Sequence, residues 1–268
     1  EHLMPSYITA LSKEISFWGN HLEHSFLDTI FLGGGTPSRL PGDSIKSLAE
    51  TIYSNFELTA PKEFTIECNP SDLSPMIIQT YLSSGINRLS IGIQSLSDQL
   101  LKVLGRRHDS LTAISALNTA RREGFCNISA DLIYGLPYQT LSDWTETLKK
   151  IVDIELPHIS MYCLTLEKGT PMEIWVKSGK LPNPDPDLAA DMYELGMDCM
   201  KAAGYEHYEI SNWAMEGYQS QHNLRYWTNQ NYLGAGPGAH SYLNGERFSN
   251  LKSPRDYINL MHGLDSES

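Results

Sequence analysis

Residues 127–133 read NISADLI, a short β-rich run in which apolar and polar side chains alternate. Successive side chains of a strand point to opposite faces. Ile128 and Leu132 therefore share one face, whereas Ser129 and Asp131 share the other. A strand of this kind has one apolar face to bury and one polar face that needs water or a ligand.

Four further β-rich runs accompany this one, with helix-length segments between them, which is typical of βα units around a parallel sheet. The expected strands are 29–33, 63–68, 88–93, 127–133 and 158–164. Strands covered on both faces normally read as continuous apolar runs, yet four of these keep a polar face. We therefore expect a barrel-like sheet around a hydrophilic chamber. The alternative is a half-solvated sheet, which hairpins rather than helix-length spacers would build.

The helices between the strands carry their own signals. Ser110 is expected to cap a helix whose apolar face includes Leu111 and Leu117. Thr140 and Asp143 form a capping-box-like start for the helix before the fifth strand.

Polar residues at the carboxyl ends of the strands are the first candidates for a site, because folds of this class bind ligands there. Glu67, Gln94 and Asp131 occupy these positions. A glycine run, Gly33–Gly35, follows the first strand and leaves backbone amides and carbonyls free to bind a ligand. The arginines of Gly105–His108 suit capture of a carboxylate or, alternatively, the close of a surface helix.

Composition narrows the class of partner. The 268 residues carry a net charge of −12, which argues against nucleic acid as the main partner. No apolar run is long enough for a transmembrane segment, and no signal-peptide pattern begins the sequence. The four cysteines are scattered without metal-ligand spacing, which favours reduced thiols and a cytoplasmic location.

The regular alternation ends after residue 164. Residues 181–187, LPNPDPD, form a proline-rich bridge that is expected to exclude a regular element. This divides the chain into a domain at 1–181 and an extension at 182–268. The extension contains HNLRYW at 222–227, which suits a flat aromatic ligand, a metal or a core cluster.

Long motifs follow one another in a recognisable order: GGGTPS at 33–38, ECNP at 67–70, RLSIGIQS at 88–95, LGRRH at 104–108 and DLIYGLPYQT at 131–140. Together they resemble the radical S-adenosylmethionine (SAM) family of oxygen-independent coproporphyrinogen III oxidases. HNxxYW at 222–227, with Gly234–His240 after it, is similar to the HemW-like branch of heme chaperones. The resemblance extends from about Thr29 to Asn250.

The resemblance implies an α/β fold, a partial (β/α)6 TIM-like barrel, that holds SAM beside a [4Fe-4S] cluster. The residues that it assigns to the methionine end of SAM are Gly34, Gly35, Thr36 and Glu67, with Arg106 at the carboxylate. Those that it assigns to the ribose are Gln94 and Asp131, and those that it assigns to heme are His222, Tyr226 and Trp227.

The family's CxxxCxxC loop is not in this sequence, so the cluster cysteines and the first strand are expected upstream of Glu1. No catalytic residue or metal ligand is assigned within the chain, and whether it acts as an enzyme stays open. The resemblance favours a chaperone that binds heme and SAM and delivers heme to an accepting protein. Its alternatives are an oxidase that decarboxylates coproporphyrinogen III and a catalytically inactive scaffold.

Overall fold

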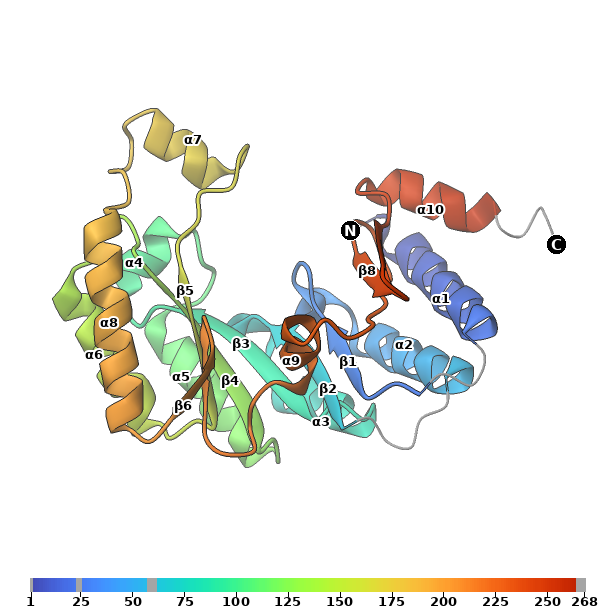
Figure 1. Ribbon diagram of the computed structural model, residues 1–268, viewed down its shortest axis with the longest axis horizontal. Coiled ribbons are helices and arrows are strands. Elements are labelled where there is room, and N and C mark those ends of the chain that lie inside the picture. Colours follow the sequence, from blue (N-terminus) through green and yellow to red (C-terminus); the bar gives the residue numbers. More distant parts are fainter. Residues whose placement is uncertain (1, 23–25, 57–61, 264–268) are drawn as a thin grey trace. The chain divides into compact units, whose positions relative to one another are not determined.

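The computed structural model describes residues 2–22, 26–56 and 62–263, in which helices and strands alternate (Figure 1). The strands are β1 Thr29–Leu32, β2 Glu63–Cys68, β3 Arg88–Gln94, β4 Asn127–Tyr134, β5 His158–Cys163, β6 Glu206–Glu209, β7 Asn212–Ala214, β8 His240–Leu243 and β9 Glu246–Ser249. The α-helices are α1 Met4–His21, α2 Gly42–Asn55, α3 Pro75–Ser83, α4 Asp98–Val103, α5 Ser110–Arg122, α6 Leu141–Asp153, α7 Pro171–Lys177, α8 Pro186–Ala202, α9 Gln221–Trp227 and α10 Pro254–Gly263.

Hydrogen bonding orders the main sheet as β1-β2-β3-β4-β5-β7-β6. β3, β4 and β5 pair in parallel, with Ser90 opposite Ser129 and Asp131 opposite Ser160. β7 runs antiparallel to β5, and β6 antiparallel to β7. The five strands expected from the sequence are confirmed, each to within one residue at its ends.

The chain forms two compact units, each described here by itself. Unit 1 comprises residues 1–65, 79–87 and 220–268, and unit 2 comprises residues 66–78 and 88–219. Unit 1 thus combines segments from both ends of the sequence, whereas unit 2 contains β3 to β7. The division of the sequence into 1–181 and 182–268 stays a prediction.

The apolar faces of the strands form the core of unit 2. Ile91, Ala130 and Ile159 are fully buried, on the side of the sheet that α5 and α8 contact. Trp144 on α6 is also fully buried, and its Nε1–H donates to the carbonyl of Met192 on α8 at 2.8 Å. The apolar side of the alternating pattern is therefore the helix-covered side, as predicted.

Local capping signals are partly as expected. The capping box of Thr140 and Asp143 at α6 is confirmed. The cap predicted at Ser110 is wrong: Asp109 caps α5 by accepting from the amide of Thr112 at 2.8 Å. Leu111 is 76% exposed and lies off the buried face, which consists of Ala113, Ala116, Leu117 and Ala120.

The proline-rich bridge also differs from expectation at its end. α8 begins at Pro186, inside the stretch that was expected to exclude a regular element. Asp185 caps it by accepting from the amides of Asp187 and Leu188. Proline is favoured in the first turn of a helix because no hydrogen bond is lost there.

A buried carboxylate joins the N-terminal helix of unit 1 to the C-terminal segment. Glu14 on α1 is 2% exposed. It accepts hydrogen bonds from the amide of Gly236 at 2.7 Å, from Asn250 Nδ2 at 2.6 Å and from the hydroxyl of Tyr257 at 2.6 Å. Burial, and then the Glu14 carboxylate, raise the pKa of Tyr257, which is therefore a neutral donor.

Replacing this acceptor should destabilise unit 1. Glu14→Gln offers one amide oxygen in place of two carboxylate oxygens and turns an NH₂ group toward donors, so we expect the free energy of unfolding to fall by about 2 kcal/mol. Urea denaturation followed by circular dichroism measures the change. Glu50→Gln on the exposed side of α2 is the control. Equal stabilities for the two variants would contradict this account.

Candidate functional site

Two serines from neighbouring strands donate hydrogen bonds to the carboxylate of Asp131. Ser90 Oγ on β3 donates to Oδ2 at 2.6 Å, and Ser129 Oγ on β4 donates to Oδ1 at 3.0 Å. Ser129 is fully buried and Ser90 is 8% exposed. The polar faces of β3 and β4 therefore point to the same side of the sheet, which confirms the alternation predicted from the sequence.

The cluster around Asp131 extends to β5 and β6. His158 Nδ1 lies 2.8 Å from Ser129 Oγ, and Ser160 Oγ lies 3.2 Å from the same atom. His158 Nε2 lies 2.7 Å from the hydroxyl of Tyr208. The imidazole of His158 is fully buried. Burial, with a smaller contribution from nearby Arg88, holds the pKa of His158 well below its ordinary value, so the ring is neutral.

The backbone is strained where β3 ends. Gln94 has a φ of +67°, a left-handed conformation that is uncommon for any residue but glycine. The register with β4 shifts between Gly92 and Gln94, as it does at a β-bulge. Bulges and strained residues of this kind turn a side chain away from the regular pleat and occur often at functional sites.

The side chains of Arg106 and Gln94 both lie next to the Cα atom of Gly92. Arg106 Nη2 donates to the carbonyl of Gly92 at 3.1 Å. A Cβ atom added to Gly92 would lie 2.8 Å from Gln94 Nε2 and 3.2 Å from Arg106 Nη2. The glycine therefore provides the space that these two side chains occupy. Burial lowers the pKa of the Arg106 guanidinium, which still carries its charge at neutral pH.

The two residues after Arg106 have structural partners. Arg107 donates to both carboxylate oxygens of Asp72, at 2.9 and 3.1 Å. His108 is 5% exposed, and its Nε2 donates to the carbonyl of Ile93 at 3.1 Å. Of the basic motif, Arg106 is thus the side chain that lies beside Gln94.

Glu67 adds to the negative charge at the carboxyl end of β2. It is partly exposed, whereas its neighbours Ile66 and Cys68 are buried on the other face. The pKa of the Cys68 thiol is raised well above its ordinary value by burial first, and then by the carboxylates of Asp72, Asp131 and Glu67. The negative field of Asp131 and Glu67 suits a ligand that carries positive charge.

The glycine loop after β1 belongs to unit 1. Gly34 has a φ of +84°, and no atom lies within 4 Å of a Cβ added to Gly34 or Gly35. Both glycines and Thr36 are exposed. The loop offers backbone groups to a ligand, and its assignment to the methionine end of SAM stays a prediction.

The segment HNLRYW forms α9 of unit 1, and a buried carboxylate holds its start. Glu63 on β2 is 2% exposed. It accepts from the hydroxyl of Ser220 at 3.2 Å and from the amides of Gln221 and His222 at 2.8 and 3.0 Å. A carboxylate in this place satisfies amides that have no partner within the helix. Sequence reasoning did not identify Glu63, which is distant in the chain.

Both ring nitrogens of His222 have hydroxyl neighbours. Nδ1 lies 2.8 Å from Thr29 Oγ1, and Nε2 lies 2.8 Å from the hydroxyl of Tyr226. The ring also stacks on Phe31, with centroids 5.1 Å apart. A hydroxyl can donate or accept, so this setting is compatible with either neutral tautomer. A ring nitrogen becomes available to iron only when its hydroxyl moves away.

The aromatic residues of α9 are open to a ligand. Tyr226 is 45% exposed and Trp227 is 53% exposed. Tyr226 packs edge-on against His222 and Tyr232, with centroids 5.1 and 4.7 Å apart. The structure therefore brings His222 and Tyr226 into contact and leaves Trp227 beside them on the surface of the helix.

The cysteines do not form a cluster site in this chain. Cys68 is buried, Cys199 is partly buried, and Cys126 and Cys163 are exposed. Within the described ranges, no group of three or more His, Cys, Asp or Glu side chains could hold a metal ion. The residues present therefore do not fit a [4Fe-4S] cluster, and no reaction step is derived through one.

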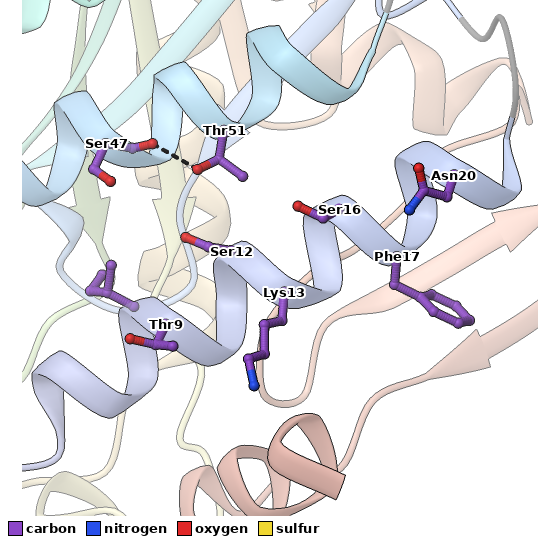
Figure 2. Close-up of a pocket in the computed structure, with 9 residues that line it drawn as sticks. Thr9, Ser12, Lys13, Ser16, Phe17, Asn20, Ser47 and Thr51 are labelled. Carbon is purple, nitrogen blue, oxygen red and sulfur yellow. Dashed lines mark hydrogen bonds between the residues drawn. The ribbon is translucent and has the colours of Figure 1, made fainter. Parts of the chain in front are cut away.

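A groove on unit 1 lies apart from these residues. It runs between α1 and α2, and Figure 2 shows the hydroxyl groups along it, with Thr51 Oγ1 donating to the carbonyl of Ser47 at 2.9 Å. Its polar lining includes Thr9, Ser12, Lys13, Ser16, Ser47 and Thr51. None of the residues predicted to bind a cofactor lines it.

The site thus consists of parallel strands β3 to β5 with polar side chains around Asp131, a strained glutamine at the end of β3, and an arginine beside it. Comparison with known proteins identifies the class as that of radical SAM proteins. The family model "Radical SAM superfamily" matches residues 20–151. The structure of coproporphyrinogen III oxidase (HemN) from Escherichia coli superposes with a TM-score of 0.85, at 24% identity, over 99% of this chain and 63% of that chain. The partial-barrel fold is thereby confirmed.

Curated relatives show to which family within the radical SAM superfamily the chain belongs. The heme chaperone HemW of Bacillus subtilis is 38% identical over 256 residues, which cover 95% of this chain and 68% of the relative. HemW of Lactococcus lactis is 39% identical over 94% of this chain and 66% of the relative. The chain belongs to the HemW family of radical SAM proteins. It spans about two thirds of the length of these relatives.

Membership of the superfamily implies SAM and a [4Fe-4S] cluster as cofactors. The names of the relatives refer to heme, and that of the solved structure to coproporphyrinogen. Among helices in the described part of the chain, none combines the length and apolar character that a membrane crossing requires.

The space over Gly92 provides a test of the predicted SAM site. Gly92→Ala should displace Gln94 and Arg106, and we expect binding of S-adenosylhomocysteine to weaken about tenfold. Isothermal titration calorimetry measures the affinity. Gly263→Ala is the control, because no atom lies within 4 Å of the added Cβ there. An unchanged affinity in Gly92→Ala would show that these side chains do not contact the ligand.

Proposed function

We propose that this chain forms the core of a heme chaperone that binds SAM at the carboxyl ends of its strands and heme at α9. The observation that carries the proposal is the 38–39% identity to HemW heme chaperones over nearly the whole chain. Two features of the molecule support it: the polar residues around Asp131, and the exposed aromatic side chains beside His222.

For SAM, each proposed contact agrees with the chemistry of the side chain. The planar guanidinium of Arg106 suits the methionine carboxylate, and the carboxylate of Glu67 suits the amino group. Gln94 and Asp131 are the residues that we propose to bind the ribose hydroxyls. Each Asp131 oxygen accepts one serine hydroxyl and keeps acceptor capacity for a second donor.

SAM bound to a reduced cluster supplies radical chemistry in this superfamily. The role that we propose for the residues of this chain is to bind and orient the ligand. Ser129, with no exposed surface, and Ser90, at 8%, close the inner side of the Asp131 carboxylate. Among the described residues, no group of three or more His, Cys, Asp or Glu side chains could hold a metal ion, and the role that we propose for these residues is binding.

For heme, α9 offers a nitrogen ligand and flat aromatic surfaces. Imidazole is a common axial ligand of heme iron, and aromatic rings pack well on a porphyrin face. His222 would bind the iron after the Tyr226 or the Thr29 hydroxyl has moved away from its ring nitrogen. Tyr226 and Trp227, both about half exposed, would contact the porphyrin.

A chaperone of this kind needs a protein that accepts the heme. We propose such a partner in the cytoplasm, the location that the scattered cysteines favour.

Hemin titration tests the heme site. We expect hemin to give a shifted Soret band with the wild-type chain. His222→Ala should move or abolish that band, because the iron loses its ligand. Trp227→Ala should weaken binding several-fold, because a packing surface is lost. Absorption spectroscopy measures both effects.

Two variants serve as controls, His262→Ala on the exposed side of α10 and Trp175→Ala on α7 of unit 2. No Soret shift with the wild-type chain would contradict heme binding. A shift that is the same in His222→Ala and Trp227→Ala would place heme elsewhere on the protein.

An anaerobic assay separates the chaperone from the oxidase. The protein that includes the family's cluster segment is incubated with SAM, a reductant and coproporphyrinogen III. We expect no protoporphyrinogen. Its formation at a catalytic rate would replace the chaperone proposal with the oxidase, and failure to bind SAM would favour an inactive scaffold.

A further inference from the structure

A continuous chain of hydrogen bonds leads from β6 to the carboxylate of Asp131. It passes from the Tyr208 hydroxyl to His158, from His158 to Ser129, and from Ser129 to Asp131, with distances of 2.7, 2.8 and 3.0 Å. His158 and Ser129 have no exposed surface. All four residues belong to unit 2.

The direction of every bond in this chain follows from the carboxylate. A carboxylate accepts hydrogen bonds and cannot donate, so the single hydroxyl proton of Ser129 points to Asp131 Oδ1. The same hydroxyl can then only accept from His158, which makes Nδ1 of His158 a donor. Ser160 Oγ, 3.2 Å from Ser129 Oγ, donates to its second lone pair.

The tautomer of His158 follows in turn. Its pKa lies well below the ordinary value because of burial and Arg88, so the ring carries one proton. That proton is on Nδ1, and Nε2 accepts from the Tyr208 hydroxyl. The donors thus all point in one direction, from Tyr208 toward Asp131. Consecutive hydrogen bonds aligned in this way polarise one another.

The position of Tyr208 depends on an irregularity in β6. The register with β7 pairs His207 with Trp213 and Glu209 with Asn212, and leaves Tyr208 as the extra residue of a bulge. Bulges redirect a side chain from the regular pleat. Here the redirected hydroxyl lies within hydrogen-bonding distance of His158 Nε2.

We propose that Tyr208, His158 and Ser129 are positioning residues that hold the Asp131 carboxylate in place for the ribose hydroxyls of the adenosyl ligand. The identity of the ligand rests on the proposed function. Ser90 donates to one carboxylate oxygen and Ser129 to the other, so neither oxygen can rotate without loss of a buried hydrogen bond.

The first test needs no ligand. ¹⁵N NMR of the histidine rings, with His158 assigned from the spectrum of His158→Asn, reports the protonated nitrogen directly. We expect a neutral ring protonated at Nδ1 at pH 7. A ring protonated only at Nε2 would overturn the chain, because Ser129 would then donate to Nδ1 and could not donate to Asp131. An imidazolium would overturn it at Tyr208, because Nε2 would then donate to the Tyr208 hydroxyl and could not accept from it.

The second test compares two ligands. S-adenosylhomocysteine and its 2′,3′-dideoxyribose analogue differ only in the hydroxyls that Asp131 would bind. Ser129→Ala should weaken the first ligand about tenfold and the second by less than about twofold. Tyr208→Phe, which removes the most distant donor and leaves the packing intact, should show the same selectivity with about a threefold loss.

Matched controls are Ser142→Ala on the exposed side of α6 and Tyr218→Phe on a loop of unit 2, for which we expect no change. Equal losses for both ligands in Ser129→Ala and Tyr208→Phe would overturn the positioning role, since a general loss of structure affects both. If the wild-type chain binds neither ligand, the SAM part of the proposed function fails, and the NMR result alone then decides whether the chain of donors exists.

Discussion

Carboxylates that accept hydrogen bonds from neighbouring elements organise this molecule; Glu14 and Glu63 are buried, and Asp131 is partly exposed. Asp131 in unit 2 accepts from Ser90 and Ser129, and in unit 1 Glu63 and Glu14 each accept three hydrogen bonds. A buried carboxylate without partners would cost several kcal/mol. Each therefore specifies what packs around it: Asp131 requires polar faces on adjacent strands, Glu63 requires the start of α9, and Glu14 requires the Gly236–Tyr257 segment.

Departures from regular strand geometry then direct side chains to the site. β3 shifts register before Gln94, whose φ is +67°, and β6 bulges at Tyr208. Both irregularities have a local energetic cost, and both turn a polar side chain toward groups that the regular pleat would not bring into contact. Gly92 completes the arrangement, because the side chains of Gln94 and Arg106 occupy the space over its Cα.

The sequence predicts the parts of this arrangement that depend on local periodicity. Alternation with a period of two located Asp131 and Ser129 on one face, and the capping box at Thr140 was evident from adjacent residues. The sequence could not predict the contact of Glu63 with the start of α9, because Glu63 and Ser220 are 157 positions apart in the chain. Nor does a bulge such as that at Tyr208 have a sequence signal, since it depends on pairing with another strand. The helix start at Asp109 was missed because Ser110 is an equally good cap.

The setting of His222 bears on the difference between a carrier and an enzyme. A carrier has to release its cargo, and release is easier when the empty site is itself stable. Without heme, the His222 nitrogens have the Thr29 and Tyr226 hydroxyls as partners, and the ring stacks on Phe31. Binding of iron would exchange one of these hydrogen bonds for a coordinate bond, so the net affinity is lower than that of an unpartnered imidazole. Return of the hydroxyl would then assist departure of the heme. Under the proposed function, the two hydroxyl partners are thus the feature that suits α9 to transfer rather than to permanent binding.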